Sequence, residues 1–274
     1  MSRWHAVLSV AAALTVAGCT QSHSHVEADA FVWSGAVAAG KWVHLRNMTG
    51  PITVELTPDT QVDVHATKRW RRSGDNVRFV ETATADGIAI CTVYAAGADC
   101  NPDNYSGRHD RSVLSSIARK TSDASVDYVV RVPAGVNIDL GTVNGPINVA
   151  KTSGTVKAET VNGDVEITAH QGALELNTVN GSVTVALDTL PATGDITMHS
   201  VNGSITAVLP PQLDGTVMFQ TVNGRISNGF PVTSIGPTNA KRIAGSVGAG
   251  GVRRIELSTV NGSVTLMKHA GTVE

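Results

Sequence analysis

Hydrophobic and polar residues alternate in short segments through the second half of the chain, on both sides of a repeated Thr-Val-Asn-Gly sequence. In every copy, the residues six and four positions before the Asn and three positions after it are apolar. The residues between them are mostly polar, and such alternation predicts half-buried β-strands. Each copy therefore predicts a strand, a corner at Asn-Gly, a second strand and a return loop. The apolar residues are Ile138, Leu140 and Ile147; Val156, Ala158 and Val165; Leu174, Leu176 and Val183; Ile196, Met198 and Ile205; Val217, Phe219 and Ile226; Ile255, Leu257 and Val264.

The corner sequence recurs at a nearly constant period, which is typical of a stack of repeated units. Successive Asn residues are 18, 18, 22, 21 and 38 residues apart. Because the last spacing is close to two repeats, we expect one degenerate or inserted unit between Gly224 and Asn261. The repeat corners are Asn144 and Gly145, Asn162 and Gly163, Asn180 and Gly181, Asn202 and Gly203, Asn223 and Gly224, and Asn261 and Gly262.

Two all-β architectures fit this pattern. Asn-Gly between alternating strands is a strong signal for a type I′ hairpin, which would give an antiparallel meander or sandwich. The other is a β-solenoid, a single-stranded β-helix-like array in which Asn-Gly is one corner of each coil. We favour the solenoid, because coils stacked in register bring the same position of each repeat into contact, which explains why the same residue recurs there. The Val before each Asn adds a second reason: strict alternation would turn it outward, so a corner or bulge is expected there. The Asn side chains could then stack between coils.

One column of charged residues bears on whether the protein is an enzyme. Parallel β-helices include polysaccharide lyases and hydrolases, so a carbohydrate-active enzyme is the alternative function, and it would need clustered carboxylates. Asp139, Glu175 and Glu256 share the column five residues before the Asn, and Lys157 lies between the first two. We interpret this column as an outward salt-bridge ladder. Because the chain also lacks a Ser-His-Asp pattern and metal-ligand spacing, we expect a non-enzymatic protein without catalytic, cofactor-binding or metal-binding residues.

Residues 1–18 have the pattern of a lipoprotein signal peptide. A short positive segment and an apolar run end in Val16-Ala17-Gly18-Cys19, which resembles the lipobox of bacterial lipoproteins. This resemblance implies cleavage before Cys19, a lipid such as palmitate on its thiol, and attachment to the membrane. By resemblance to Gram-negative lipoproteins, the absence of Asp after Cys19 implies sorting to the outer membrane. We expect residues 19–35 to be a lipidated tether.

Residues 36–135 predict a less regular β region before the repeat region, which spans residues 136–274. The segment 48–54 resembles a worn copy of residues 143–149, so the solenoid is expected to begin near residue 36. In an exported chain, Cys91 and Cys100 are expected to form a disulfide. The basic cluster 68–72 fits either a charged strand edge that resists aggregation or a contact with anionic lipid, lipopolysaccharide or nucleic acid.

Composition narrows the choice of partner. The formal net charge is −2, and only 16% of the residues are charged. Nucleic-acid binding proteins usually carry a basic surface, so we expect no nucleic-acid partner.

The lipobox, the Cys91–Cys100 segment, Val132 to Gly135 and the repeat array together resemble the bacterial "putative adhesin" family, a β-repeat domain of unknown function. The resemblance covers roughly residues 36–270 and implies a β-solenoid in the cell envelope. It supplies no catalytic residues. We therefore expect a rigid scaffold or adhesin-like binding module whose partner is an envelope protein or a glycan.

Overall fold

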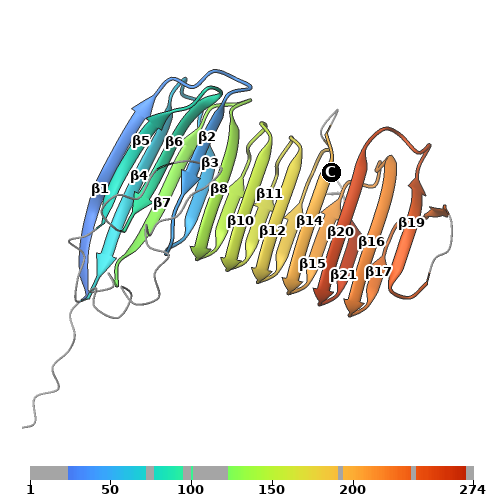
Figure 1. Ribbon diagram of the computed structural model, residues 1–274. Helices are drawn as coiled ribbons and strands as arrows, with labels where there is room; N and C mark the ends of the chain where they lie inside the picture. Colours follow the sequence, from blue (N-terminus) through green and yellow to red (C-terminus); the bar gives the residue numbers. More distant parts are fainter. Residues whose placement is uncertain are drawn as a thin grey trace, which may run out of the picture.

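The computed structural model describes residues 24–71, 77–94, 100, 123–190, 194–235 and 239–269. All regular elements in these ranges are β-strands, arranged in two sheets that face each other along an elongated body (Figure 1). Within the same ranges, no helix is long and apolar enough to cross a membrane. Cys19 and the expected signal peptide, residues 1–18, lie outside the described residues.

The first sheet has ten strands. In spatial order they are β1 (His25–Gly35), β4 (Val62–Trp70), β7 (Ser125–Val132), β3 (Ile52–Leu56), β9 (Ile147–Ala150), β11 (Val165–Thr168), β13 (Val183–Ala186), β15 (Ile205–Leu209), β21 (Val264–Lys268) and β17 (Ile226–Asn228).

The second sheet has eleven strands. Their order is β18 (Thr233–Ser234), β19 (Arg242–Val247), β16 (Gly215–Asn223), β20 (Arg254–Asn261), β14 (Ile196–Asn202), β12 (Leu174–Asn180), β10 (Val156–Asn162), β8 (Asn137–Asn144), β2 (Trp42–Arg46), β6 (Gly87–Val93) and β5 (Arg78–Ala83).

Each repeat places one strand in each sheet, so one repeat is one coil of a solenoid. β10 pairs in parallel with β8 and β12, and β11 pairs in parallel with β9 and β13. Lys157 lies opposite Asp139 on one side and opposite Glu175 on the other, as stacking in register requires. The solenoid prediction is therefore confirmed, and the antiparallel meander is not formed.

The core lies between the two sheets and follows the alternation in the sequence. The column four residues before the Asn is at most 1% exposed in all six coils. The Thr or Ser two residues before the Asn also points inward and is buried, and its hydroxyl donates to the carbonyl oxygen of the corner Gly in the neighbouring coil. This bond satisfies a polar group that burial would otherwise penalise. The inward column contains Leu140, Ala158, Leu176, Met198, Phe219 and Leu257.

The corner Gly is required by close approach and not by a hairpin turn. None of the six corner glycines has a positive φ, so the type I′ geometry suggested by Asn-Gly is absent. A Cβ on Gly163 would lie 2.0 Å from the carbonyl oxygen of Gly145, and a Cβ on Gly181 would lie 1.9 Å from that of Gly163. Only Gly therefore fits where one coil passes over the next.

The corner Asn side chains form a continuous ladder along one edge of the body. Each amide Nδ2 donates to the Oδ1 of the neighbouring Asn at 2.7–2.9 Å, from Asn144 through Asn162, Asn180, Asn202 and Asn261 to Asn223. The amides stack between coils, as the repeated Asn predicted.

The Val before each Asn points outward, and the bulge expected there is absent. Alternation continues through this position, since Thr160 pairs with Thr178 and Asn162 pairs with Asn180 in one register. The valines of five coils are 39–55% exposed on the outer face of the second sheet. The solenoid is correct, but this reason for preferring it was wrong: the outward valines stack on one another across adjacent strands, and such side-chain pairs stabilise a sheet.

The N-terminal end extends the solenoid by two coils. β2 and β3 stack on β8 and β9, with Ile52 opposite Ile147, so the worn copy is a true coil. β6 and β7 form a further coil outside β2 and β3, and a disulfide joins Cys91 on β6 to Cys100, as predicted.

Antiparallel strands close this end. β1 and β4 follow β7 in one sheet, and β5 follows β6 in the other. Residues 19–35 were expected to form a tether, but residues 25–35 of that range form strand β1 instead. The reason is that this strand pairs with β4 and so belongs to the fold.

The C-terminal end departs from the order of the sequence. The last coil, β20–β21, lies between the coil β14–β15 and the coil β16–β17, although both precede it in the chain (Figure 1). The segment between Gly224 and Asn261 contains no degenerate coil among its described residues. It contributes β18 and β19, and β19 pairs antiparallel with β16 and covers its edge.

Candidate binding groove

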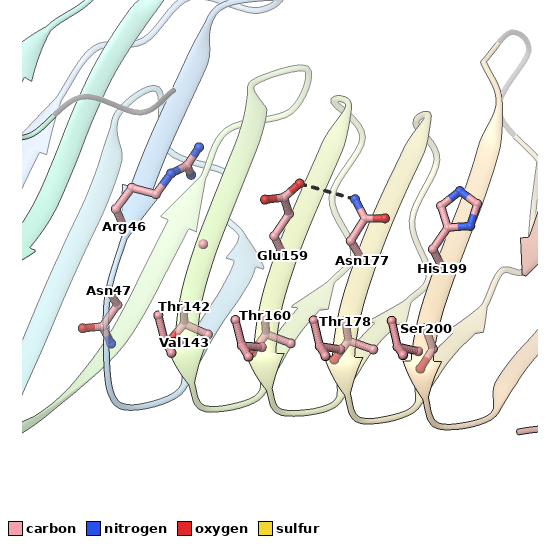
Figure 2. A pocket seen from close by; sticks show the side chains of 14 residues that line it. Arg46, Asn47, Thr142, Val143, Glu159, Thr160, Asn177, Thr178, His199 and Ser200 are labelled. Atoms are coloured by element: carbon pink, nitrogen blue, oxygen red, sulfur yellow. Dashed lines mark hydrogen bonds between the residues drawn. The ribbon is translucent and has the colours of Figure 1, made fainter. Parts of the chain in front are cut away.

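A shallow hollow of about 600 Å³ runs across the outer face of the second sheet. It crosses β2, β8, β10, β12 and β14, so five neighbouring coils contribute to it (Figure 2). We call it the outer-face groove. Its lining residues are Arg46, Asn47, Gly141, Thr142, Val143, Glu159, Thr160, Val161, Asn177, Thr178, Val179, His199, Ser200 and Val201.

Polar side chains form one row of the groove, three residues before each Asn. Glu159, Asn177 and His199 occupy this row on successive strands, and all three project from the same face (Figure 2). The Asn177 amide donates to Glu159 at 3.4 Å, a weak bond. The row thus offers a carboxylate, an amide and an imidazole, which together can donate and accept hydrogen bonds.

Gly141 occupies the same row on β8 and leaves space for Arg46. A Cβ at Gly141 would lie 2.9 Å from Cδ of Arg46, so the aliphatic part of Arg46 packs over the glycine. The missing side chain also deepens the surface between Arg46 and Glu159.

The exposed valines form the second row of the groove, beside the polar row. Val161 and Val179 are each 39% exposed, and Val201 is 41% exposed. Adjacent parallel strands are about 4.7–4.9 Å apart, so both rows repeat at that interval along the body. The groove is therefore a regular surface with one apolar row and one hydrogen-bonding row.

A cluster of charged residues borders the groove at β2. Asp139 Oδ2 accepts hydrogen bonds from Nδ1 of His44 at 2.8 Å and from Nη2 of Arg46 at 2.6 Å. His44 Nε2 lies 3.4 Å from Oδ1 of Asp86, and the His44 ring stacks on Trp42. Because Arg46 also donates to the carbonyl oxygens of Leu45 and Asp139, its guanidinium is held at the end of the groove.

The surroundings of this cluster favour its charged forms. Burial disfavours the protonated imidazole of His44, but hydrogen bonds and attraction from Asp139 and Asp86 outweigh burial and raise its pKa. Burial likewise opposes the charged carboxylate of Asp139, yet His44 and Arg46 lower its pKa. The cluster is therefore a partly buried set of ion pairs.

The predicted salt-bridge ladder is formed only in part. Lys157 Nζ lies 3.4 Å from Oε2 of Glu175 and 5.5 Å from the centre of the Trp42 ring. Asp139 occupies the expected place in the column but pairs with His44 and Arg46, which come from a coil that the repeat motif does not mark. The match between residues 48–54 and residues 143–149 implies that His44 lies opposite Asp139, as the structure shows.

Two residues of the basic cluster near the N-terminal end form ion pairs, and Arg72 lies outside the described residues. Lys68 pairs with Glu27 at 2.5 Å, and Arg69 pairs with Asp127 at 2.6 Å. Trp70 stacks on His25, so this His is held against the fold and not in a solvated tether. Residues 68–70 do not lie on an open strand edge, because β4 pairs with β1 on one side and with β7 on the other, so the strand-edge interpretation is wrong.

The described residues do not assemble an evident catalytic or metal site. The groove has one carboxylate in its lining, Glu159. No group of three or more His, Cys, Asp or Glu residues within the described ranges could hold a metal ion. What the groove can do chemically is form hydrogen bonds and apolar contacts along a line.

The model of the Toastrack DUF4097 family matches residues 118–267, which is more than half of the chain. A solved structure of a "putative cell adhesion protein" from Clostridium sporogenes is 10% identical, with 87% of this chain and 99% of that chain covered and a TM-score of 0.47. A "putative adhesin" from Bacteroides fragilis is 13% identical, with 87% and 96% covered and a TM-score of 0.30. No curated protein matches. The repeat array that builds the coils is the part that the family model matches, and the chain belongs to the Toastrack DUF4097 family.

Proposed function

We propose that this protein is a non-enzymatic, adhesin-like binding module of the cell envelope and that its outer-face groove holds an extended glycan. One observation carries this proposal: the hydrogen-bonding row of Glu159, Asn177 and His199 and the apolar row of Val161, Val179 and Val201 run side by side across three coils. A chain with hydroxyl groups on its edges and C–H groups on its faces matches both rows.

The paired backbone supports a ligand that is recognised through side chains. In the groove, β8, β10, β12 and β14 each pair with strands on both sides. A peptide that binds by strand addition needs an open sheet edge. The groove offers Glu159, Asn177 and His199 instead, which suit the hydroxyl and amide groups of sugars.

A carbohydrate-active enzyme is less well supported by the same surface. Glycosidases commonly place two carboxyl groups about 5–9.5 Å apart across the bond that they cleave. The lining contains Glu159, and the nearby Asp139 is held by His44 and Arg46. The groove therefore fits retention of a glycan better than its cleavage.

We further propose that Cys19 carries a lipid that anchors the protein to the outer membrane. Ser24 is the first described residue, and strand β1 begins at His25. Five residues span at most about 18 Å, so this end of the body would lie close to the bilayer. The groove begins at β2 and extends away from this end, where it would remain accessible.

Binding to a glycan array of bacterial envelope and host-surface oligosaccharides tests the groove. Glu159→Gln and Val179→Lys should each weaken binding by about tenfold, which corresponds to about 1.4 kcal/mol. The matched control is Glu166→Gln, since Glu166 belongs to the same coil but lies on the first sheet. Equal losses in the groove and control variants would contradict the proposed site, and the lack of any bound glycan would contradict the ligand class.

Cys19→Ser tests the anchor separately. The variant should remain an unprocessed precursor or leave the membrane fraction. A variant that is processed and stays membrane-bound like the parent would contradict lipidation at Cys19.

A further inference from the structure

The C-terminal coil, β20–β21, fills a slot between two coils that precede it in the chain. On one side β20 pairs with β14 and β21 pairs with β15. On the other side β20 pairs with β16 and β21 pairs with β17. Both neighbours are synthesised before the coil that separates them, so the slot is filled last.

The contacts that hold this coil are those found throughout the array. Asn261 donates to Asn202 and accepts from Asn223, and Thr259 donates to the carbonyl oxygen of Gly203. A Cβ on Gly262 would lie 2.1 Å from that same oxygen, as at the other corners. These contacts depend on the repeat sequence and not on the chain that supplies it.

The segment that leads into the coil has the composition of a hinge. Residues 248–253 read Gly-Ala-Gly-Gly-Val-Arg and connect β19 to β20. Gly248 and Gly250 have positive φ, and Val252 is 97% exposed. In the present structure Asp214 holds this segment in place: its Oδ1 accepts a hydrogen bond from the backbone N–H of Gly251 at 2.8 Å. Six extended residues span about 20 Å, so this segment can carry the coil away from its own slot.

We propose that two copies of this chain exchange their C-terminal coils, so that the slot of each copy binds residues 254–268 of the other. Removal of the coil without replacement would expose Ile255, Leu257, Val264 and Leu266, which are at most 1% exposed. Reciprocal exchange restores every one of these contacts and changes only the hinge, which is why such swaps cost little. The exchanged pair carries two outer-face grooves, and it does not depend on what those grooves bind.

Crosslinking can show whether the C-terminal coil occupies the slot of its own chain or the slot of a second copy. Thr197 and Glu256 are direct neighbours on β14 and β20, and Glu175 and Thr197 are direct neighbours on β12 and β14. In the mature chain with Cys19→Ser, one variant carries Thr197→Cys and Glu256→Cys. The matched control carries Glu175→Cys and Thr197→Cys, which do not exchange. Each is refolded at a series of protein concentrations and treated with a short bis-maleimide.

The Thr197 and Glu256 pair should give covalent dimers, and at low occupancy their fraction should rise about tenfold for a tenfold rise in protein concentration. The control pair should link within one chain at every concentration. Asp214→Ala should increase the dimer fraction, because it removes the bond that holds Gly251. Asp164→Ala, which removes a similar bond to the backbone N–H of Ser182, should leave that fraction unchanged.

Exclusively intrachain crosslinks of the Thr197 and Glu256 pair at all concentrations would overturn the proposal. Two differently tagged parent chains, unfolded and refolded together, provide a second test without cysteine substitutions. Mixed-tag dimers support exchange if they form after co-refolding and not after mixing of the folded chains. Failure to form any mixed dimer would overturn the proposal as well.

Discussion

The middle of the solenoid and its two ends use the same coil but stack it in different orders. From β8–β9 to β14–β15, each coil lies beside the coil that precedes it in the sequence. At the N-terminal end, the coil β2–β3 lies between β6–β7 and β8–β9. At the C-terminal end, the coil β20–β21 lies between β14–β15 and β16–β17. A coil therefore accepts any neighbour with the same columns, whatever its position in the chain.

The ends also differ from the middle in how their edges are closed. A parallel stack leaves unpaired backbone groups at each end, and these invite aggregation. Here β1, β4 and β5 close one end, and β18 and β19 close one sheet at the other. At both ends, strands that close the stack come earlier in the sequence than a coil that lies nearer the middle: β4 and β5 precede β8–β9, and β18 and β19 precede β20–β21. Closure of the edges and stacking out of sequence order therefore occur together.

Substitution of a corner glycine should give the largest loss of stability, and the loss should be equal in the middle and at the end if the coils pack in the same way. Gly163→Ala in the middle and Gly262→Ala at the end should each lower the free energy of unfolding by more than about 4 kcal/mol, because a Cβ would meet backbone within 2.1 Å. Denaturant unfolding measures both. Gly40→Ala is the control for steric contact, since nothing lies within 4 Å of its Cβ position, although its positive φ of 80° adds some strain. A small loss at Gly262 alone would show that the inserted coil packs more loosely.

Core truncation compares the two regions next. Leu176→Ala and Leu257→Ala should each cost about 2–5 kcal/mol, because both side chains are fully buried. The outward neighbour Asn177 should tolerate Ala within roughly 0.5 kcal/mol. Chemical unfolding curves check these values. Equal costs at Leu176 and Asn177 would contradict the assignment of inner and outer faces.

Two buried histidines, one in the middle and one at the N-terminal end, should make the free energy of unfolding depend on pH in opposite directions. His170 lies in a return loop of the middle, where its Nε2 accepts from the N–H of Gly172. Burial lowers its pKa from 6.5 to about 4. Between those values only the unfolded chain binds the proton, so the free energy of unfolding should fall by about 3 kcal/mol as the pH falls.

His44 at the N-terminal end should act in the other direction. Its pKa is raised in the fold, so its contribution is fully present below pH 6.5 and is lost as the pH rises through the raised value. Thermal unfolding across pH values measures both effects. His170→Gln should remove the acid loss, and His44→Gln should remove the alkaline loss. An unchanged acid profile in His170→Gln would assign that loss to other groups.

The Asn ladder should give the smallest effect. Asn180→Ala in the middle and Asn261→Ala at the end each interrupt two side-chain bonds at the surface. Each bond contributes about 0.5–1.5 kcal/mol at most, and exposure to water reduces this, so a total near 1 kcal/mol is expected. Differential scanning calorimetry can compare the two variants. A much larger loss for Asn261 would mean that the ladder, and not the core, retains the inserted coil.

Local pattern was enough to predict the fold class and most of the coil. The alternation around Leu176 identified inner and outer faces, and the equal spacing of Asp139, Lys157 and Glu175 predicted their parallel register. The groove was not predicted. Its polar row depends on Glu159, Asn177 and His199, which share no residue type, and its end depends on Arg46, which lies outside the marked repeats.

What the sequence by itself determined is the structure of each of the six repeat coils, because each carries its own alternation and its own Thr-Val-Asn-Gly or Ser-Val-Asn-Gly corner. Only the tertiary structure decided the order of the coils. The spacing of 22 from Asn180 to Asn202 leads to the adjacent position, whereas the spacing of 21 from Asn202 to Asn223 passes over one position. The two spacings look equivalent in sequence, because all coils present the same columns to their neighbours. Order then depends on where the connecting segments and closing strands lie, which no single repeat encodes.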